Sequence, residues 1–291
     1  MKQRRYKVVD VFTNQPLLGN PVAVVLDAED LDTATMQAIA RWTNLSETTF
    51  LLPATTPKSD YRLRIFTPRS ELPFAGHPTL GSAYAALEAE HVTARDGQLV
   101  MECGVGLVKL AIHRTSTGHS LMLGLPEAKF KHLLPDDMAE LEAVLGQAVL
   151  RELTPAIVNV GAVWIVAQIP SVENLLALKP NFERCTLLER RLGVTGITVF
   201  AIYKTGEPAM EVRSFAPSCG VNEDPVCGSG NGSVAVFLRE SGFIPAEVVS
   251  YSASQGQCIG RNGIIAVQVD SSGRVSVGGA CVTIIDGVLC C

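Results

Sequence analysis

Several side chains in this sequence combine types and positions that suit proton transfer, and Glu47 is the first of them. It lies in Leu45-Ser46-Glu47-Thr48-Thr49-Phe50, on the threshold of an apolar stretch with the character of a strand. A carboxyl group in such a place can lose its water, which raises its pKa and suits it to act as a general acid and base. The competing interpretation is a solvated glutamate at a strand end.

An imidazole follows in a glycine-containing turn, Phe74-Ala75-Gly76-His77-Pro78, which leads into a helix predicted over 79–90. A helix N-terminus favours the neutral form of His77, which can donate or accept a hydrogen bond. A capping or core histidine is the alternative. Pro78 suits a first helical turn, where its missing N–H costs nothing.

A second turn, Asp224-Pro225-Val226-Cys227-Gly228-Ser229-Gly230, leads into a helix predicted over 231–241. Asp224 can orient His77 across a cleft, or merely start the turn. Ser229 can donate to a substrate oxygen, or cap the helix. Cys227 lies at a helix start, where the pKa of a thiol falls, and its alternative is a buried, inert thiol.

Both turns offer backbone donors at a helix start. The first N–H groups of a helix lack internal partners, and the helix dipole is positive at that end. Gly76 and Gly228 let the backbone approach a ligand closely, so each turn can hold an anion such as a small carboxylate. The phosphate-binding motif G-x-x-x-x-G-K-[ST] is absent, which disfavours a nucleotide. Two ordinary helix caps are the competing interpretation.

The elements around these turns repeat along the chain. Alternating stretches at 61–68 and 210–217 both end in Phe-x-Pro, and each precedes one of the turns and its helix. Further matching pairs, all offset by about 150 residues, are the stretches 48–52 and 198–202 and the strand-like runs 98–113 and 249–269. A shared offset over several elements predicts a duplicated α+β lobe.

The division between the lobes is expected in the small polar stretch Thr115-Ser116-Thr117-Gly118. The predicted domains are therefore 1–117 and 118–291, and the last strands can return to the first lobe. Further helices are predicted over 33–43, 136–149 and 171–178. The first of these has Met36, Ile39, Ala40 and Trp42 as its apolar residues and Asp30 or Asp32 as its cap.

Composition limits the class of protein. The chain has 291 residues, 47% of them hydrophobic, and a formal net charge of −5, so a sizeable core is expected and nucleic acid is not an expected partner. A membrane span and a secretory signal are not expected, which favours a cytoplasmic location. The eight cysteines form no C-x-x-C pair and no metal-ligand spacing with histidine, so reduced thiols are expected, with Cys290 and Cys291 in a frayed tail.

These residues resemble the PhzF family of phenazine-biosynthesis-like isomerases. The matching segments, in family order and over nearly the whole chain, are Gly19-Asn20-Pro21-Val22-Ala23-Val24, Ser46-Glu47-Thr48, Phe66-Thr67-Pro68, Glu71-Leu72-Pro73-Phe74-Ala75-Gly76-His77-Pro78-Thr79, Glu223-Asp224-Pro225 and Gly228-Ser229. The Phe-Ala-Gly-His-Pro-Thr block is highly specific, and Gly-Asn-Pro-x-Ala-Val supports it.

The resemblance implies a diaminopimelate-epimerase-like fold with two lobes, each a barrel-like mixed sheet around a central helix, and a homodimer. It also implies activity without metal, nucleotide or pyridoxal cofactor, similar to trans-2,3-dihydro-3-hydroxyanthranilate isomerisation. On that pattern Glu47 is the acid and base, and His77, Asp224 and Ser229 position the substrate. The binding residues carried over with them are Gly76, Pro78, Gly228 and Gly230, with Asn20 and Cys227 as additional candidates.

One departure keeps other functions open. The family turn resembles Glu-Asp-Pro-Ala-Thr-Gly-Ser-Ala, whereas this chain has Cys227 and Gly230 at two of its positions. Cys227 falls where the related epimerases carry one of two catalytic cysteines, and Ala75 falls at the other. Gly230 is expected to enlarge the pocket. The alternatives are an amino-acid epimerase or racemase that uses Cys227 with Glu47, and a non-catalytic metabolite-binding protein.

Overall fold

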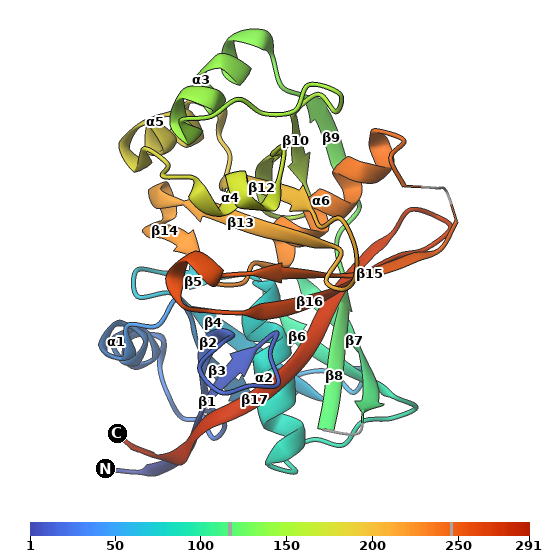
Figure 1. Ribbon diagram of the computed structural model, residues 1–291. Helices are drawn as coiled ribbons and strands as arrows, with labels where there is room; N and C mark the ends of the chain where they lie inside the picture. Colours follow the sequence, from blue (N-terminus) through green and yellow to red (C-terminus); the bar gives the residue numbers. More distant parts are fainter. Residues whose placement is uncertain (116–117, 245–246) are drawn as a thin grey trace. The chain divides into compact units, whose positions relative to one another are not determined.

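The computed structural model describes residues 1–115, 118–244 and 247–291 (Figure 1). The chain divides into two compact units: Met1–Leu123 with Gly278–Cys291 is the first, and Gly124–Val277 is the second. The chain therefore enters the second unit once and then returns. The boundary expected at 117 and 118 involves residues 116–117, which lie outside the described residues.

The first unit is a closed barrel of mixed strands. Its elements are β1 (Gln3–Val11), β2 (Asn20–Val25), α1 (Thr33–Thr43), β3 (Thr48–Leu52), β4 (Tyr61–Phe66), β5 (Glu71–Leu72), α2 (Gly76–Glu88), β6 (Gln98–Cys103), β7 (Gly106–Thr115), β8 (Gly118–Gly124) and β17 (Val275–Cys290). The ring runs β1-β2-β3-β4-β6-β7-β8-β17 and closes from β17 to β1. The pairs β2–β3 and β4–β6 are parallel.

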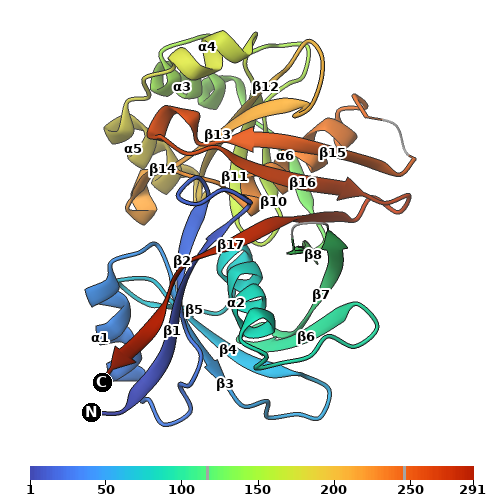
Figure 2. The same ribbon diagram turned by 60° about the horizontal axis from the view of Figure 1, so that its bottom comes forward.

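Helix α2 runs through this barrel, as Figure 2 shows. Its residues from Pro78 to Ala83 are all buried, since strands surround it. Small residues let the helix approach the wall: a Cβ on Gly81 would lie 2.4 Å from Cγ1 of Val22 and 2.8 Å from Cγ2 of Val11. Glycine at position 81 therefore lets α2 approach the wall at a point where a larger side chain would clash.

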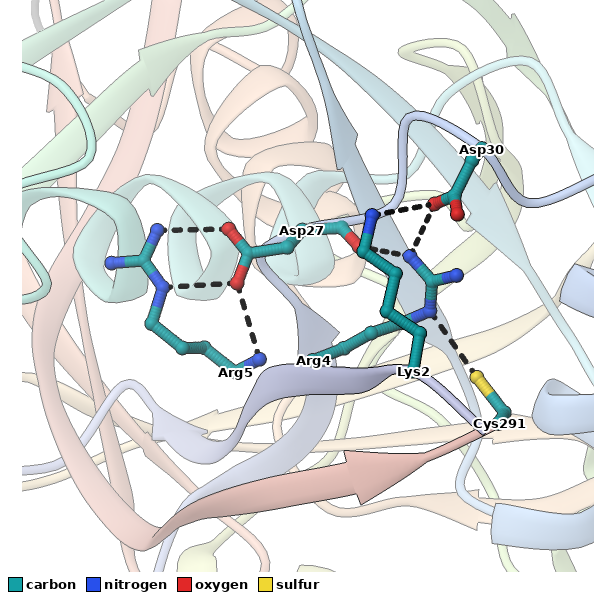
Figure 3. A network of polar contacts seen from close by, with 6 residues as sticks. All are labelled: Lys2, Arg4, Arg5, Asp27, Asp30 and Cys291. Atoms are coloured by element: carbon teal, nitrogen blue, oxygen red, sulfur yellow. Dashed lines mark hydrogen bonds and ion pairs between the residues drawn. The ribbon is translucent and has the colours of Figure 1, made fainter.

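The two ends of the chain are joined in the first unit. Strands β1 and β17 pair antiparallel, and Lys2 and Cys291 exchange two backbone hydrogen bonds. Figure 3 shows the polar network around them, in which the buried Arg4 donates to Asp30 at 2.5 Å and to the Cys291 sulfur at 3.3 Å. The expectation of a frayed tail at Cys290 and Cys291 is wrong, because the barrel wall holds both residues.

The second unit repeats the pairing pattern of the first. Its strands are β9 (Lys129–His132), β10 (Ala156–Asn159), β11 (Val163–Gln168), β12 (Gly196–Ile202), β13 (Met210–Ala216), β14 (Val221–Asp224), β15 (Val249–Gln255) and β16 (Gly263–Val269). Strands β11–β12 and β13–β15 are parallel, whereas β12–β13 and β15–β16 are antiparallel. This is the order of β2–β3, β3–β4, β4–β6 and β6–β7, so the predicted duplication is confirmed.

In the described part of the second unit, a central helix is accompanied by three outer ones. They are α6 (Gly228–Glu240), which packs against β9 to β12 and β16, and the outer helices α3 (Pro135–Leu145), α4 (Val172–Ala177) and α5 (Phe182–Leu192). The outer helices cover a core on β11 and β12 that includes Ile165 and Val199. Short 3-10 turns follow β13 and β15, at Pro217–Cys219 and Gln257–Ile259.

The helices differ from the predicted ones in ways that local geometry explains. Helix α3 ends at Leu145, earlier than predicted, because Gly146 takes the left-handed conformation that terminates helices. Asp32 caps α1 by accepting from the Thr35 N–H, whereas Asp30 pairs with Arg4. Trp42 was expected on the apolar face of α1, but it is 80% exposed.

Two further expectations concern the cysteines and membrane-spanning helices. All eight cysteines are free thiols. Within the described ranges, no helix has the length and apolar character that a membrane crossing needs.

Candidate active site

The first unit brings Glu47 and His77 together. Glu47 immediately precedes β3, and its carbonyl accepts a hydrogen bond from the Ala23 N–H of β2 at 3.3 Å. His77 lies in the first turn of α2. Oε2 of Glu47 is 3.2 Å from Nε2 of His77, and the two side chains are 15% and 11% exposed. The pair is therefore held between a strand start and a helix start, largely out of water.

Two buried hydroxyl groups fix the helix against the strand that carries Glu47. Thr49 of β3 lies 2.7 Å from the Ser82 hydroxyl of α2, and it donates to the Ala23 carbonyl at 3.1 Å. Both hydroxyls are fully buried. The contact ties β2, β3 and α2 together two residues beyond Glu47, so it positions the carboxyl against the imidazole. Sequence analysis missed Thr49 and Ser82.

Burial raises the pKa of Glu47 to about 7, and a hydrogen bond from the Ser46 side chain is a smaller effect in the opposite direction. The cause is loss of hydration, which penalises the ionised form. A carboxyl group with a pKa near neutrality is present in both forms at pH 7. It can therefore accept a proton and give it back, as general acid–base catalysis requires.

The neighbouring residues predicted for binding occupy the same region of the first unit. The helix begins at Gly76, earlier than predicted, so Pro78 is buried within its first turn. A Cβ on Gly76 would meet the Leu123 side chain at 3.7 Å, an ordinary contact, so packing does not require glycine there. Asn20 is buried at the start of β2, opposite Val11.

In the second unit, Asp224 ends β14 and starts the turn that leads to α6. Its Oδ1 accepts from the Val226 N–H at 3.1 Å, which is the local hydrogen bond of an aspartate-initiated turn. Cys227 is the N-cap of α6, and its sulfur accepts from the Gly230 N–H at 3.3 Å. The turn-starting interpretation of Asp224 therefore holds locally, while a capping role for Ser229 does not.

The thiol of Cys227 is not activated. Burial raises its pKa above the ordinary value, and the nearby Asp224 carboxylate raises it further. Hydrogen bonds from Ser229 and from the Gly230 N–H act in the opposite direction but are weaker. Of the two interpretations of Cys227, the structure therefore agrees with the buried, inert thiol, because desolvation outweighs the helix start.

Ser229 meets a partner that sequence analysis missed. The indole Nε1–H of Trp164, on β11, donates to the Ser229 hydroxyl at 3.1 Å. The same hydroxyl lies 3.6 Å from the Cys227 sulfur. Trp164 is 65 residues away in sequence, so only the fold brings it here.

A buried glutamine holds the whole turn. Gln255 accepts from the Cys227 N–H at 3.1 Å and from the Asn231 amide at 2.8 Å. It donates to the Asp224 carbonyl at 2.9 Å. One side chain from the end of β15 therefore fixes both ends of the segment that carries Asp224, Cys227 and Ser229.

Packing accounts for Gly230. A Cβ there would lie 2.7 Å from the Ser214 hydroxyl, 2.8 Å from the Thr198 hydroxyl and 3.2 Å from the Cys227 sulfur. The space beside Gly230 is thus occupied by side chains of β12 and β13 and does not enlarge a pocket. Gly228, the first residue of α6, is buried.

The structure therefore assembles the predicted residues in two groups. Glu47 and His77 meet in the first unit, and Asp224, Cys227 and Ser229 meet in the second. Each group lies at the start of the central helix of its unit. An approach of Asp224 to His77 across a shared cleft stays a prediction.

Comparisons with known proteins show what this chain is similar to. The family model of phenazine biosynthesis-like proteins, PhzC-PhzF, matches residues 9–287. The chain is 40% identical over 295 residues to "Antisense-enhancing sequence 1" of Schizosaccharomyces pombe, covering 99% of both chains. It is 37% identical over 278 residues to trans-2,3-dihydro-3-hydroxyanthranilate isomerase of Pseudomonas aeruginosa, covering 94% of this chain and 93% of that one.

Solved structures agree on the fold. The chain is similar to a phenazine biosynthesis protein of the PhzF family from Bacillus anthracis, with a TM-score of 0.90, 25% identity and complete coverage of both chains. A hydroxyproline epimerase from Agrobacterium vitis matches with a TM-score of 0.67 and 14% identity over 99% of this chain and 92% of that one. The second similarity concerns the fold alone, and it confirms the expected diaminopimelate-epimerase-like architecture.

Proposed function

The chain belongs to the PhzC-PhzF family of phenazine biosynthesis-like proteins and is an isomerase, and from this premise we propose that it moves a proton within a small carboxylate-bearing metabolite. Glu47 takes a proton from one carbon and returns it to another. The reaction needs no metal, nucleotide or pyridoxal cofactor. The observation that carries the proposal is the buried Glu47 carboxyl, with a pKa of about 7, 3.2 Å from the His77 imidazole.

His77 orients the carboxyl in this mechanism. The Nε2 atom of His77 lies 3.2 Å from Oε2 of Glu47 and so helps to hold the carboxyl group in one orientation beside the substrate. After proton transfer, the protonated Glu47 is stabilised by the same lack of water that raises its pKa. Asp224 and Ser229 position the substrate, with backbone N–H groups of the Gly76 and Gly228 turns as further donors.

Two named relatives guide the choice of substrate class. The proteins from Pseudomonas aeruginosa and Pseudomonas fluorescens are both trans-2,3-dihydro-3-hydroxyanthranilate isomerases, and the second is 34% identical to this chain. We therefore propose a dihydroaromatic or similarly unsaturated amino acid as substrate. We also propose that the protein acts in the cytoplasm as a homodimer, which the family resemblance supports.

The test follows hydrogen at the reacting carbons. The chain is incubated with trans-2,3-dihydro-3-hydroxyanthranilate and related unsaturated amino acids in D2O, and deuterium in the product is measured by mass spectrometry. Glu47→Gln should abolish turnover and deuterium uptake while the circular dichroism spectrum is unchanged. Glu29→Gln is the matched control, because Glu29 is an exposed carboxylate of the same unit. A folded Glu47→Gln protein that still exchanges would refute the assignment.

The epimerase alternative makes a separate demand on Cys227. A thiol base must ionise, and burial together with Asp224 works against that. Cys227→Ser should therefore leave isomerisation largely intact. Loss of an inversion at an α-carbon in this variant, with the fold unchanged, would instead favour the epimerase.

A further inference from the structure

The indole N–H of Trp164 donates a hydrogen bond to Ser229, and the proposed proton-transfer mechanism assigns no role to this donor. We propose that Trp164 is a positioning residue: its N–H occupies an acceptor site of the Ser229 hydroxyl and so turns the hydroxyl proton toward an oxygen of the substrate. This inference rests on the proposed function, because it assigns Ser229 to substrate binding. It adds that the group bound there is a hydrogen-bond acceptor, such as a carboxylate or carbonyl oxygen.

The direction of the hydrogen bond is fixed by chemistry. An indole N–H can only donate, so the Ser229 oxygen must be the acceptor across the 3.1 Å contact. A serine hydroxyl has one proton, which then has to point elsewhere. A free serine could turn either way, whereas this one keeps its proton available for an incoming acceptor.

The protein around Ser229 competes weakly for that proton. The nearest sulfur, that of Cys227, is 3.6 Å away and is a weak acceptor. The same sulfur already accepts from the Gly230 N–H, and its own proton interacts with the Asp224 carboxylate. A carboxylate or carbonyl oxygen is a better acceptor than this thiol.

The indole ring is held in place. Trp164 is 3% exposed and stands opposite Gly196 in the parallel pair of β11 and β12. A Cβ on Gly196 would lie 2.6 Å from the Cζ3 atom of the ring and 2.2 Å from the Phe215 carbonyl oxygen. Because residue 196 is glycine, the ring can fill the space beside it. This packing fixes the ring in the orientation in which its N–H donates to Ser229.

The first test is spectroscopic and does not need a substrate. The chain has two tryptophans, so Trp42→Phe, which changes an 80% exposed side chain, assigns the remaining indole N–H signal in a 15N–1H spectrum to Trp164. Ser229→Ala should shift that signal and speed its exchange with solvent. Ser229→Thr, which keeps an acceptor oxygen, should preserve both. An unchanged Trp164 signal in Ser229→Ala would overturn the proposal.

The second test uses anthranilate, a non-reacting aromatic carboxylate, as the probe. Anthranilate should move the Trp164 signal and leave that of Trp42 in place. Trp164→Phe and Ser229→Ala should each weaken its binding by about fivefold to tenfold, the range of one hydrogen bond, and the double variant should be no weaker than Ser229→Ala. Additive losses, or an unmoved Trp164 signal, would overturn the inference. Failure of the Glu47 experiment alone would count against the proton shift and leave this result standing.

Discussion

At the scale of single residues, the Glu47 carboxyl carries a cost that pH should reveal. Its pKa in the folded chain is about 7, against an ordinary value of 4.5. The folded state therefore holds more protons than the unfolded state between these values, and stability falls as the pH rises through that window. The stabilisation is fully present below about pH 4.5 and is lost above about pH 7.

Glu47→Gln removes this dependence. We expect its free energy of unfolding to match that of the parent chain near pH 4.5 and to exceed it by about 3 kcal/mol at most above pH 7. Denaturant titrations at pH 5 and pH 8 measure the difference, and Glu29→Gln, which keeps Glu47, is the control that should retain the pH dependence of the parent chain. An advantage for Glu47→Gln that is equal at both pH values would contradict the burial argument.

The Cys227 thiol should be unreactive. It is buried and its pKa is raised, whereas Cys219 is exposed in the same unit. Because thiolates and not thiols react with iodoacetamide, Cys219 should be alkylated at pH 8 long before Cys227 in the folded protein. Peptide mass spectrometry gives the labelling at each cysteine, and full labelling in denaturant is the control. Rapid labelling of Cys227 in the folded chain would revive the thiol mechanism.

Residue chemistry was predictable only where it was local. Glu47 could be found from its place before an apolar strand, and His77 from its helix start. For Cys227 the sequence offered both a lowered pKa and a buried, inert thiol, and the choice between them depends on burial, which is a property of the fold. Trp164 and Gln255 were missed because their partners are distant in sequence. Ser229 lies 65 residues from Trp164 and Cys227 lies 28 residues from Gln255, and no local sequence pattern predicts such contacts.

At the scale of elements, Gly81 shows why the central helices contain small residues. Alanine favours a helix by about 1 kcal/mol over glycine, yet a Cβ here would meet Val22 at 2.4 Å inside the barrel. Overpacking of a core typically costs about 1–3 kcal/mol. Gly81→Ala should therefore lower the free energy of unfolding, and adding Val22→Ala should restore part of it. Chemical denaturation measures both, and a more stable single variant would contradict this packing.

Hydrophobic periodicity in the sequence predicts most of the helices and strands, and capping residues define where the helices begin and end. The helix over 33–43 was predicted at its observed bounds because an aspartate cap and regular apolar spacing agree there. Helix α5 was missed, although Asn181 caps its start and Gly193 ends it in the left-handed conformation. Those two signals were in the sequence. Strand pairing is different, since parallel partners such as β4 and β6 become visible only through the repeat.

At the scale of the whole molecule, the first barrel depends on the last strand. β17 pairs with β1 on one side and with β8 on the other, so it closes the ring. The sequence analysis allowed the last strands to return to the first lobe. The sequence alone, however, does not indicate which strands a terminal strand pairs with. The duplicated half offers no guide, because the matching pairs do not include β17.

Removal of Gly278–Cys291 should consequently open the first barrel. Both β1 and β8 would lose a hydrogen-bonded neighbour, and Lys7 of β1 would lose Asp286, its partner at 2.6 Å. Hydrogen–deuterium exchange should then rise sharply over β1 and β8, while β12 and β13, whose partners all lie within 124–277, stay protected. Removal of Cys290 and Cys291 alone is the matched control and should affect only the first residues of β1. Unchanged protection of β1 and β8 in the longer truncation would show that the ring does not need its closing strand.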